Sequence, residues 1–421
     1  MISKDSEPLM PCSNVIARLL LKQGKVKVKK RVPFTIKLLY DTAEYTQKLT
    51  LGVDTGSSHV GTAVSDDNGN ICYMADTKIR NDISSKMEQR AKYRRNRRFR
   101  KTRYRKARWL NRKNSIKEGR FSPTMRSKFR SHEKEIEFVE SILPISKLVI
   151  ETGTFDTHLM KNPALANENI KHWGYQRGVN YGFENIKAKV LDRDRYICQC
   201  CKGKHKGSKL EVHHIIFRSQ GGSDKEDNLI TLCSTCHYNV HHGKQKLNLK
   251  GKLKGTLKYA TQMNSIRKQL LERVYPNATE TFGYITKANR YINGIEKTHY
   301  SDACMIASGG KHIKVLQEAV YFKVDVPKGD YQRTKGVRSQ QILPKGKICG
   351  FKKFDKVLYL GKNYFIKGRM SSGYAILMNI EGNKVDFSSM PKGYKTPKLS
   401  KCHRLSARTS QMIGCRFISH L

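Results

Sequence analysis

The sequence lacks any long apolar run and is poor in acidic residues. Its 421 residues include 82 Lys and Arg but 35 Asp and Glu, which gives a formal net charge of +47. No window approaches the ~20 apolar residues of a membrane-spanning helix. Charged residues near the N-terminus, Lys4, Asp5 and Glu7, interrupt the apolar core that a signal peptide would need. We therefore expect no membrane partner and a cytoplasmic location.

The positive charge requires a polyanionic partner, because such a chain otherwise repels itself. A hydrophobic content of 38% is too high for a disordered basic tail, so the chain should fold. Its length gives room for roughly three domains of ordinary size. Nucleic acid is the expected partner.

Eleven cysteines are present, and the spacing of four of them is typical of a zinc site. Cys198 with Cys201, and Cys233 with Cys236, form two Cys-x-x-Cys pairs, which supply the four thiolates of a tetrahedral Zn²⁺ site. Cys200 lies inside the first pair and is an alternative ligand to Cys201. The other cysteines show no disulfide-type spacing, and we expect reduced thiols.

A His-His dipeptide lies between the two cysteine pairs, followed by an asparagine and a third histidine. The residues are His213, His214, Asn228 and His237. Neighbouring side chains on a strand point to opposite faces, so one imidazole can face a metal ion while the next accepts a proton. A zinc ribbon that only binds or holds a partner is the alternative, but it would not need this combination.

This stretch resembles the HNH, or ββα-metal, endonuclease family. The resemblance implies that His213 and His237 bind a catalytic Mg²⁺ and that His214 is the general base. It also implies that Asn228 braces the loop carrying the base. His241 or His242 could replace His237 as the ligand.

Three further acidic residues follow apolar segments or lie on an expected helix. Asp54 and Glu151 each close a predicted strand, and Asp302 lies three residues after His299, on the same helical face. Each alone also fits an ordinary strand end or helix cap. Together, three carboxylates are suited to hold two Mg²⁺ (or Mn²⁺) ions for phosphodiester hydrolysis, with His299 positioning or deprotonating the water.

The first of these segments resembles the first motif of a RuvC, ribonuclease H-like nuclease. Its glycines, Gly52 and Gly56, are expected to leave room for the ion and a phosphate beside Asp54.

The most basic segment runs from Arg90 to Lys113. Fourteen of its 24 residues are Lys or Arg, none is acidic, and no Pro or Gly interrupts it. We expect a helix that phosphates neutralise, since like charges four residues apart would destabilise it alone. A localisation signal is the alternative. The expected nucleic-acid contacts are Arg90, Arg94, Arg95, Arg97, Arg98, Arg100, Arg103, Arg105 and Arg108.

A nuclease core split in three, an arginine-rich helix, an HNH insertion and an N-terminal Pro8-Leu-Met-Pro11 together resemble IscB. This family comprises transposon-associated RNA-guided nucleases related to CRISPR type II effectors. The fold implied is α/β and multidomain: a split ribonuclease H-like core, a bridge helix, a zinc-bound ββα-metal module and a small C-terminal β-rich domain. The resemblance implies a noncoding guide RNA and target double-stranded DNA as partners of one protein chain in a ribonucleoprotein.

The expected division of the chain follows this resemblance. The parts are an N-terminal domain over 1–48, RuvC-like parts over 49–82 and 119–160, a bridge helix over 83–118, a linker over 161–189, the HNH domain over 190–245, a linker with the third RuvC-like part over 246–322, and a C-terminal domain over 323–421 that binds RNA and reads a target-adjacent motif. Two other classes remain open, a protein-guided HNH homing or repair endonuclease and a catalytically silent RNA-binding scaffold.

Overall fold

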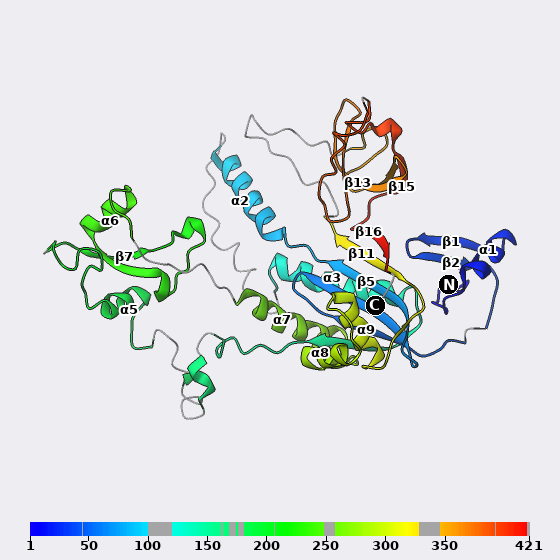
Figure 1. Cartoon of the computed structure of the whole chain (residues 1–421), viewed down its shortest axis with the longest axis horizontal. Helices are drawn as coiled ribbons and strands as arrows, with labels where there is room; N and C mark the ends of the chain where they lie inside the picture. The colour runs from blue at the N-terminus through cyan, green and yellow to red at the C-terminus, as the bar shows by residue number, and fades with distance from the viewer. Residues whose placement is uncertain are drawn as a thin grey trace. The chain divides into compact units, whose positions relative to one another are not determined.

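The computed structural model describes residues 1–43, 45–99, 120–160, 163–167, 174–175, 181–205, 207–247, 257–327, 346–391 and 393–418. The chain folds into two compact units, both drawn in Figure 1. Unit 1 comprises Met1–Gly153 and Gln262–Leu421, and unit 2 comprises Thr154–Thr261. Unit 2 is thus an insertion in the sequence of unit 1.

A small αββ element opens unit 1. It consists of α1 (Asn14–Lys22) and an antiparallel hairpin of β1 (Val26–Arg31) and β2 (Phe34–Leu38). The Ser13 hydroxyl accepts a hydrogen bond from the Ile16 backbone N–H and so caps α1. The alternating Lys and Val of β1 place the apolar side chains on one face. Its apolar core contains Leu9, Ala17, Val26, Ile36 and Leu38.

The centre of unit 1 is a large mixed sheet. Its strand order is β16-β11-β5-β4-β3-β6-β9, with β10 paired to β5. The strands β3, β4 and β5 are antiparallel neighbours, whereas β6 runs parallel to β3 and β9 parallel to β6. The bounds are β3 (Leu49–Asp54), β4 (His59–Asp66), β5 (Asn70–Lys78), β6 (Ile145–Thr152), β9 (Thr279–Phe282), β10 (Lys314–Val315), β11 (Ala319–Asp325) and β16 (Gln411–Phe417).

Helices cover both faces of this sheet, which explains why its strands are apolar on both sides. On one face, α3 (Pro123–Glu140) and α7 (Lys258–Gln269) pack against alternate residues of β3, including Leu51 and Val53. On the other face lies α9 (His299–Ser308), whose small residues pack against Ala63 of β4.

The glycines near Asp54 make room for the protein's own backbone. A Cβ on Gly52 would lie 2.5 Å from both the Ala303 carbonyl oxygen and the Ala307 nitrogen of α9, and one on Gly56 would lie 2.3 Å from the His59 carbonyl oxygen. The expectation that they clear a path for metal and phosphate is therefore corrected. The space they leave is filled by α9 and by the turn before β4.

The arginine-rich segment begins on α2 (Ile83–Phe99). Within the described residues, the expected helix is present as far as Phe99, and the Arg90 and Arg94 side chains are exposed. Arg100, Arg103, Arg105 and Arg108 lie outside the described residues, as do the side chains of Arg95, Arg97 and Arg98.

A smaller antiparallel sheet follows β11, with strand order β14-β13-β12-β15. Its strands are β12 (Lys356–Tyr359), β13 (Lys362–Arg369), β14 (Ala375–Met378) and β15 (His403–Ser406), and a short 3₁₀ turn, η6 (Leu399–Lys401), precedes β15. Its core contains Val357, Tyr359, Ile366 and Leu377.

The chain then returns to the large sheet, where β16 pairs antiparallel with β11 along seven residue pairs. Both ends of the segment 323–421 therefore join the large sheet, and the smaller sheet lies between them in sequence. This pairing satisfies backbone groups of β11 that would otherwise form an open edge.

Two further helices lie between α7 and α9 in sequence. The π-helix η5 (Leu270–Val274) follows α7, and α8 (Gly283–Ile292) follows β9. The strand β9 ends at Phe282, because the chain turns into α8 where Gly283 passes close to the Glu151 carboxylate.

Unit 2 contains a hairpin flanked by two helices. It consists of α5 (Ile186–Arg193), β7 (Leu210–His214), β8 (Leu229–Cys233) and α6 (Ser234–His241). The short 3₁₀ turns are η2 (Pro163–Ala166), η3 (Arg218–Gln220) and η4 (Glu226–Asn228). Arg193 of α5 donates hydrogen bonds to the Glu226 and Leu229 carbonyl oxygens, so α5 is tied to β8. In the described parts of the chain no helix is long and apolar enough to cross a membrane.

Candidate functional site

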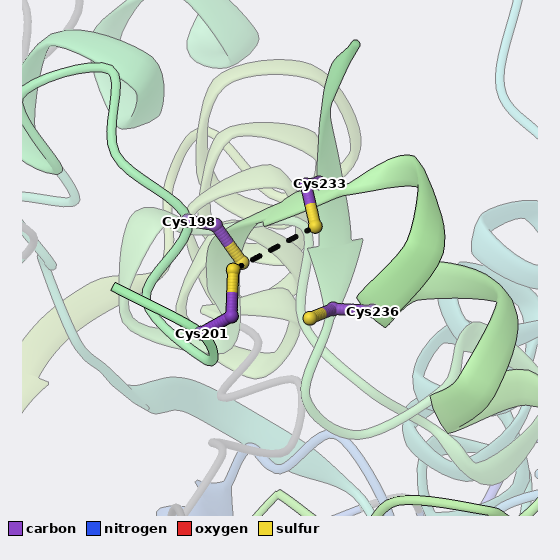
Figure 2. Close-up of side chains that lie close together, drawn as sticks. All are labelled: Cys198, Cys201, Cys233 and Cys236. Carbon is purple, nitrogen blue, oxygen red and sulfur yellow. Dashed lines mark hydrogen bonds between the residues drawn. The ribbon is translucent and has the colours of Figure 1, made fainter. Parts of the chain in front are cut away.

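Four cysteine sulfurs converge at one end of the hairpin in unit 2. Cys198 and Cys201 come from the turns after α5, Cys233 ends β8, and Cys236 lies in the first turn of α6. Figure 2 shows the four side chains directed toward a common point, and their sulfurs all lie within 4.8 Å of one another. Cys200 lies outside this group. The donor set fits a tetrahedral Zn²⁺, which these four thiolates would hold.

The protonation chemistry of these thiols also suits a cation. The backbone N–H of His205 donates to Cys201 and lowers the pKa of its thiol to about 6. Burial raises the pKa of Cys233 and Cys236, so these thiols resist ionisation without a cation. A bound metal ion would reverse that preference, because it stabilises the thiolate directly.

Three histidines form a second cluster in unit 2, from β7 and α6. His213, His237 and His241 each offer one ring nitrogen, and these nitrogens lie within 4.8 Å of one another. The Nε2 atoms of His237 and His241 are 3.2 Å apart. His213 is 3% exposed, and its Nε2 atom is buried without a hydrogen-bond partner in the described structure. Burial, aided by its histidine neighbours, lowers the pKa of His213 to about 4, so it is neutral at pH 7 and able to bind a metal.

A carboxylate orients one of these imidazoles. Glu211 Oε2 lies 2.7 Å from His237 Nδ1, which leaves Nε2 as the nitrogen available to a metal. Of the two later histidines, His241 belongs to the cluster with His213 and His237. His242 stacks on Tyr238 at 3.9 Å between ring centroids and is not part of the cluster.

The neighbouring histidine faces a different carboxylate. His214 Nε2 lies 2.9 Å from Asp224 Oδ1, which also accepts a hydrogen bond from Arg218 Nε at 2.7 Å. The two residues of the His-His dipeptide thus face different groups, as alternation along a strand requires.

Asn228 braces the loop between these two elements. Its side chain is fully buried and bonds to both the N–H and the carbonyl of Ile216, at 3.0 Å each, and to the Ser223 carbonyl at 2.8 Å. Gly222 is required beside it, since a Cβ there would lie 1.8 Å from the Ile216 carbonyl oxygen.

A cavity of about 500 Å³ opens over the histidines. Its lining residues are Val212, His213, His214, Phe217, Arg218, Ser219, His237 and His241. The His213 nitrogen has no hydrogen-bond partner in the described structure, Glu211 orients His237, and the cavity is open. Together these features fit a divalent ion with positions free for other ligands.

The acidic residues of unit 1 meet on the face of the sheet that α9 covers. Asp54 and Glu151 are directly paired in register on the parallel strands β3 and β6. Burial raises the pKa of Glu151 to about 7, and the nearby Asp54 and Asp302 add to this shift. The Glu151 Oε2 atom is buried without a partner in the described structure, which fits a group that binds a cation.

Two basic side chains contact Asp54 and Asp302. His299 Nδ1 lies 2.8 Å from Asp54 Oδ2, and this carboxylate raises the pKa of the imidazole. Arg290 of α8 forms an ion pair with Asp302, with Nε and Oδ1 3.0 Å apart. Burial raises the pKa of both Asp54 and Asp302.

The structure therefore brings Asp54, Glu151, His299 and Asp302 to one region, although the three carboxylates do not form a ligand group as tight as the two in unit 2. Within the described residues, the groups whose ligand atoms all lie within 4.8 Å are the four cysteines and the three histidines. A divalent ion held by these acids would compete with His299 and Arg290 for their oxygens.

Sequence reasoning missed several residues that hold these groups. Glu211 has a local signal, since it lies two positions before His213 on the same strand face. Asp224 and Arg290 have none, because their partners are distant in sequence or on another element. The Arg290 and Asp302 contact joins two helices.

Comparison with known proteins identifies two regions. Residues 1–178 match the family described as "RRXRR protein", and residues 198–243 match "HNH endonuclease". The first region contains Arg94-Arg95-Asn96-Arg97-Arg98, which has the spacing that this description names.

The similar curated proteins align with short stretches of the chain. The type IV methyl-directed restriction enzyme EcoKMcrA of Escherichia coli is 38% identical over 71 residues, 15% of this chain and 25% of that protein. Probable mobile endonuclease C of phage T4 is 59% identical over 32 residues, 8% of this chain and 15% of that protein. Anaredoxin of Nostoc is 33% identical over 69 residues, 16% of this chain and 88% of that protein. The chain thus spans a quarter of EcoKMcrA's length.

Among solved structures, Streptococcus thermophilus Cas9 in complex with an AGGA PAM is similar at 13% identity and a TM-score of 0.31. The alignment covers 58% of this chain and 32% of that one.

The protein is therefore a mixed α/β chain that carries an HNH endonuclease domain with a four-cysteine cluster. The RRXRR and HNH regions together confirm the resemblance to the IscB family that was drawn from the motifs.

Proposed function

We propose that this protein is an RNA-guided DNA endonuclease that cuts both strands of a guide-matched duplex. The HNH site would cut the guide-paired strand and a RuvC-like site the displaced strand. The observation that carries the proposal is the presence of two side-chain constellations of different chemistry on two separately folded units. In unit 2 the constellation consists of His213, His237 and His241, with His214 next to His213. In unit 1 it consists of Asp54, Glu151 and Asp302 with His299.

A ribonuclease H-like assignment for unit 1 is supported by the order and direction of its strands. Three antiparallel strands are followed by two parallel ones, β6 and β9, beside β3. Asp54 and Glu151 extend from the centre of this arrangement, and Asp302 lies on the helix that covers it. Divalent ions bound there would stabilise the attacking and leaving oxygens of a phosphodiester.

His299 would position or deprotonate the attacking water at this site. Its Nδ1 bonds to Asp54, so Nε2 is the nitrogen left to hold a proton from water. Arg290 would keep the Asp302 carboxylate ionised despite its burial.

In the HNH site, His213, His237 and His241 would hold one Mg²⁺ or Mn²⁺, with His237 fixed by Glu211. His214 would take a proton from water. Asp224 would orient the imidazole and stabilise its charged form. Asn228 would keep the loop between them in place, since it bonds to both sides of that loop.

Guide RNA is proposed as the partner that neutralises the net charge of +47. The helix α2 and the arginines that follow it would bind RNA phosphates as a bridge helix, and the smaller sheet would contact RNA and a short motif beside the target. The exposed Arg90 and Arg94 support such contacts. One protein chain with one guide RNA would form the ribonucleoprotein.

Sequencing of the RNA that copurifies with the protein tests this proposal. We expect one noncoding RNA species with a variable segment, and cleavage in Mg²⁺ only of duplexes matching that segment. Recovery of no discrete RNA, with cutting of a fixed DNA sequence by the protein alone, would contradict it.

The second candidate is a protein-guided HNH endonuclease. It is favoured by the similarity of short stretches of the chain to a restriction enzyme and a probable mobile endonuclease. Such an enzyme should cut normally after ribonuclease treatment, whereas the ribonucleoprotein should not.

A further inference from the structure

A second histidine lies beside His299 on the α9 face of the large sheet. The rings of His59 and His299 are stacked with centroids 5.1 Å apart and planes 9° from parallel. Each ring also contacts a carboxylate through Nδ1: His59 contacts Asp76 Oδ1 at 2.9 Å, and His299 contacts Asp54 Oδ2 at 2.8 Å. The Asp76 side chain is 16% exposed and the His59 side chain 32%. The two imidazoles are thus parallel, and each is bonded to its own carboxylate through Nδ1.

The sheet register explains how His59 reaches this place. His59, Gly61 and Ala63 alternate along β4 on the face that α9 covers, where Ala63 packs against the helix. Gly61 allows α9 to begin directly over the strand, because a Cβ there would lie 1.9 Å from the His299 carbonyl oxygen. His59 is the next residue on this face and therefore flanks the His299 ring.

Asp76 reaches His59 across the strand pair. Gly61 pairs with Asp76 and His59 with Lys78, so Asp76 is the diagonal neighbour of His59 on the same face of β5. Asp76, on a buried central strand, thus fixes the His59 ring through Nδ1.

We propose that His59 is a positioning residue for His299, anchored by Asp76. This inference rests on the proposed function of unit 1. A single contact, from Nδ1 to Asp54, fixes the direction of one ring nitrogen but permits rotation of the ring about that line. A flat ring stacked on one face removes this rotation and fixes the direction of His299 Nε2 toward the water that it would activate.

The test uses the full ribonucleoprotein and a matched duplex with each strand labelled separately. Its variants are His59→Ala, which removes the ring, His59→Phe, which keeps a flat ring without the Asp76 contact, and Asp76→Ala in both the native and the His59→Ala background. His312→Ala removes an exposed histidine elsewhere in unit 1 and serves as the matched control. Cutting of the guide-paired strand in the same reactions is the internal control for folding and assembly.

We expect His59→Ala to lower kcat for the displaced strand about tenfold while KM for the duplex changes less than about twofold. His59→Phe should recover most of that rate. Asp76→Ala should lower it about threefold in the native background and have no effect when His59 is absent, because Asp76 acts through His59. His312→Ala should match the native protein.

The inference is overturned if His59→Ala cuts the displaced strand at the native rate. It is equally overturned if His59→Phe is as slow as His59→Ala, if Asp76→Ala lowers the rate in both backgrounds, or if cutting of both strands falls together. A native ribonucleoprotein that never cuts the displaced strand would instead refute the proposed function.

Discussion

At the residue scale, the histidine cluster of unit 2 depends on a carboxylate that is not itself one of the candidate metal ligands. Glu211 lies 2.7 Å from His237 Nδ1 and fixes which ring nitrogen faces the other two histidines. We predict that Glu211→Gln weakens Mn²⁺ binding at this site by about 10- to 100-fold, the usual cost of losing such a partner. Electron paramagnetic resonance titration in an Asp54→Ala background, which weakens the other site, measures this.

The matched control for Glu211→Gln is Asp192→Asn, which removes an exposed carboxylate from the end of α5. Its Mn²⁺ affinity should equal that of the parent protein. Equal affinity in Glu211→Gln would show that His237 needs no orienting partner.

His132 of α3 supplies a pH dependence of stability. Burial lowers its pKa from 6.5 to about 4, and Nδ1 donates to the Lys128 carbonyl oxygen at 2.8 Å. The unfolded chain therefore binds a proton between pH 6.5 and pH 4 that the folded chain excludes. Stability that is fully present above pH 6.5 should be lost as the pH falls through this window, by about 3 kcal/mol for a shift of this size.

His132→Phe removes this titration while keeping a flat ring in the core. Urea unfolding between pH 7.5 and pH 4.5 should show a smaller decrease of the midpoint for His132→Phe than for the native protein. Parallel decreases in both proteins would show that His132 is not protonated differently on unfolding.

Residue types with fixed local spacing are the ones that the sequence predicted well. The four cysteines are separated by two residues within each pair, and the histidines lie on β7 and on α6, the helix that follows the β7–β8 hairpin. Direct contacts made by the tertiary fold were not predictable. His299 and Asp54 were expected in one site, but not their hydrogen bond across 245 positions. The His59 and Asp76 pair depends on the register of β4 and β5, which no spacing reveals.

At the scale of elements, the four-cysteine cluster joins the turn after α5 to the end of β8 and the start of α6. We predict that Cys233→Ser loses the bound zinc and unfolds this part of unit 2, because binding free energy of a structural zinc is also folding free energy. Elemental analysis and limited proteolysis measure the two effects.

Cys200→Ser is the control, since Cys200 neighbours Cys201 but lies outside the cluster. It should keep zinc and resist proteolysis as the native protein does. Native protein without zinc would contradict the assignment.

The contact between β3 and α9 gives a prediction for the large sheet. A methyl group on Gly52 would lie 2.5 Å from backbone atoms of α9, which cannot move independently of the helix. We predict that Gly52→Ala destabilises unit 1 by about 1–3 kcal/mol. It should also impair cutting of the displaced strand, because α9 carries His299 and Asp302. Gly346→Ala, where nothing lies within 4 Å, should leave the unfolding midpoint unchanged.

Equal unfolding midpoints for Gly52→Ala and Gly346→Ala would mean that α9 is not held against β3 as described.

The expected strands were found where apolar residues run up to an acid, as in β3 and β6. The sequence did not predict where β9 gives way to α8, since both share apolar and aromatic residues. It also did not predict that β16 returns to the large sheet, because strand pairing across the smaller sheet depends on long-range register.

At the scale of the whole molecule, the family and the presence of an HNH domain followed from motifs, and the excess of basic residues indicated a nucleic-acid partner. The insertion of unit 2 in the sequence of unit 1 follows from the order of the same motifs. The arrangement of the arginine-rich segment beyond Phe99 lies outside the described residues, and its role stays a prediction.

In the proposed mechanism, two independent sites on the two units cut opposite strands. Cleavage of a matched duplex labelled on each strand, by ribonucleoproteins carrying Asp54→Ala or His214→Ala, tests it most directly. Asp54→Ala should lose cutting of the displaced strand alone. His214→Ala should lose cutting of the guide-paired strand alone, by about 10²- to 10⁴-fold, the usual contribution of a general base. If either variant binds the target but fails to cut both strands, the two sites are not independent and the account is wrong.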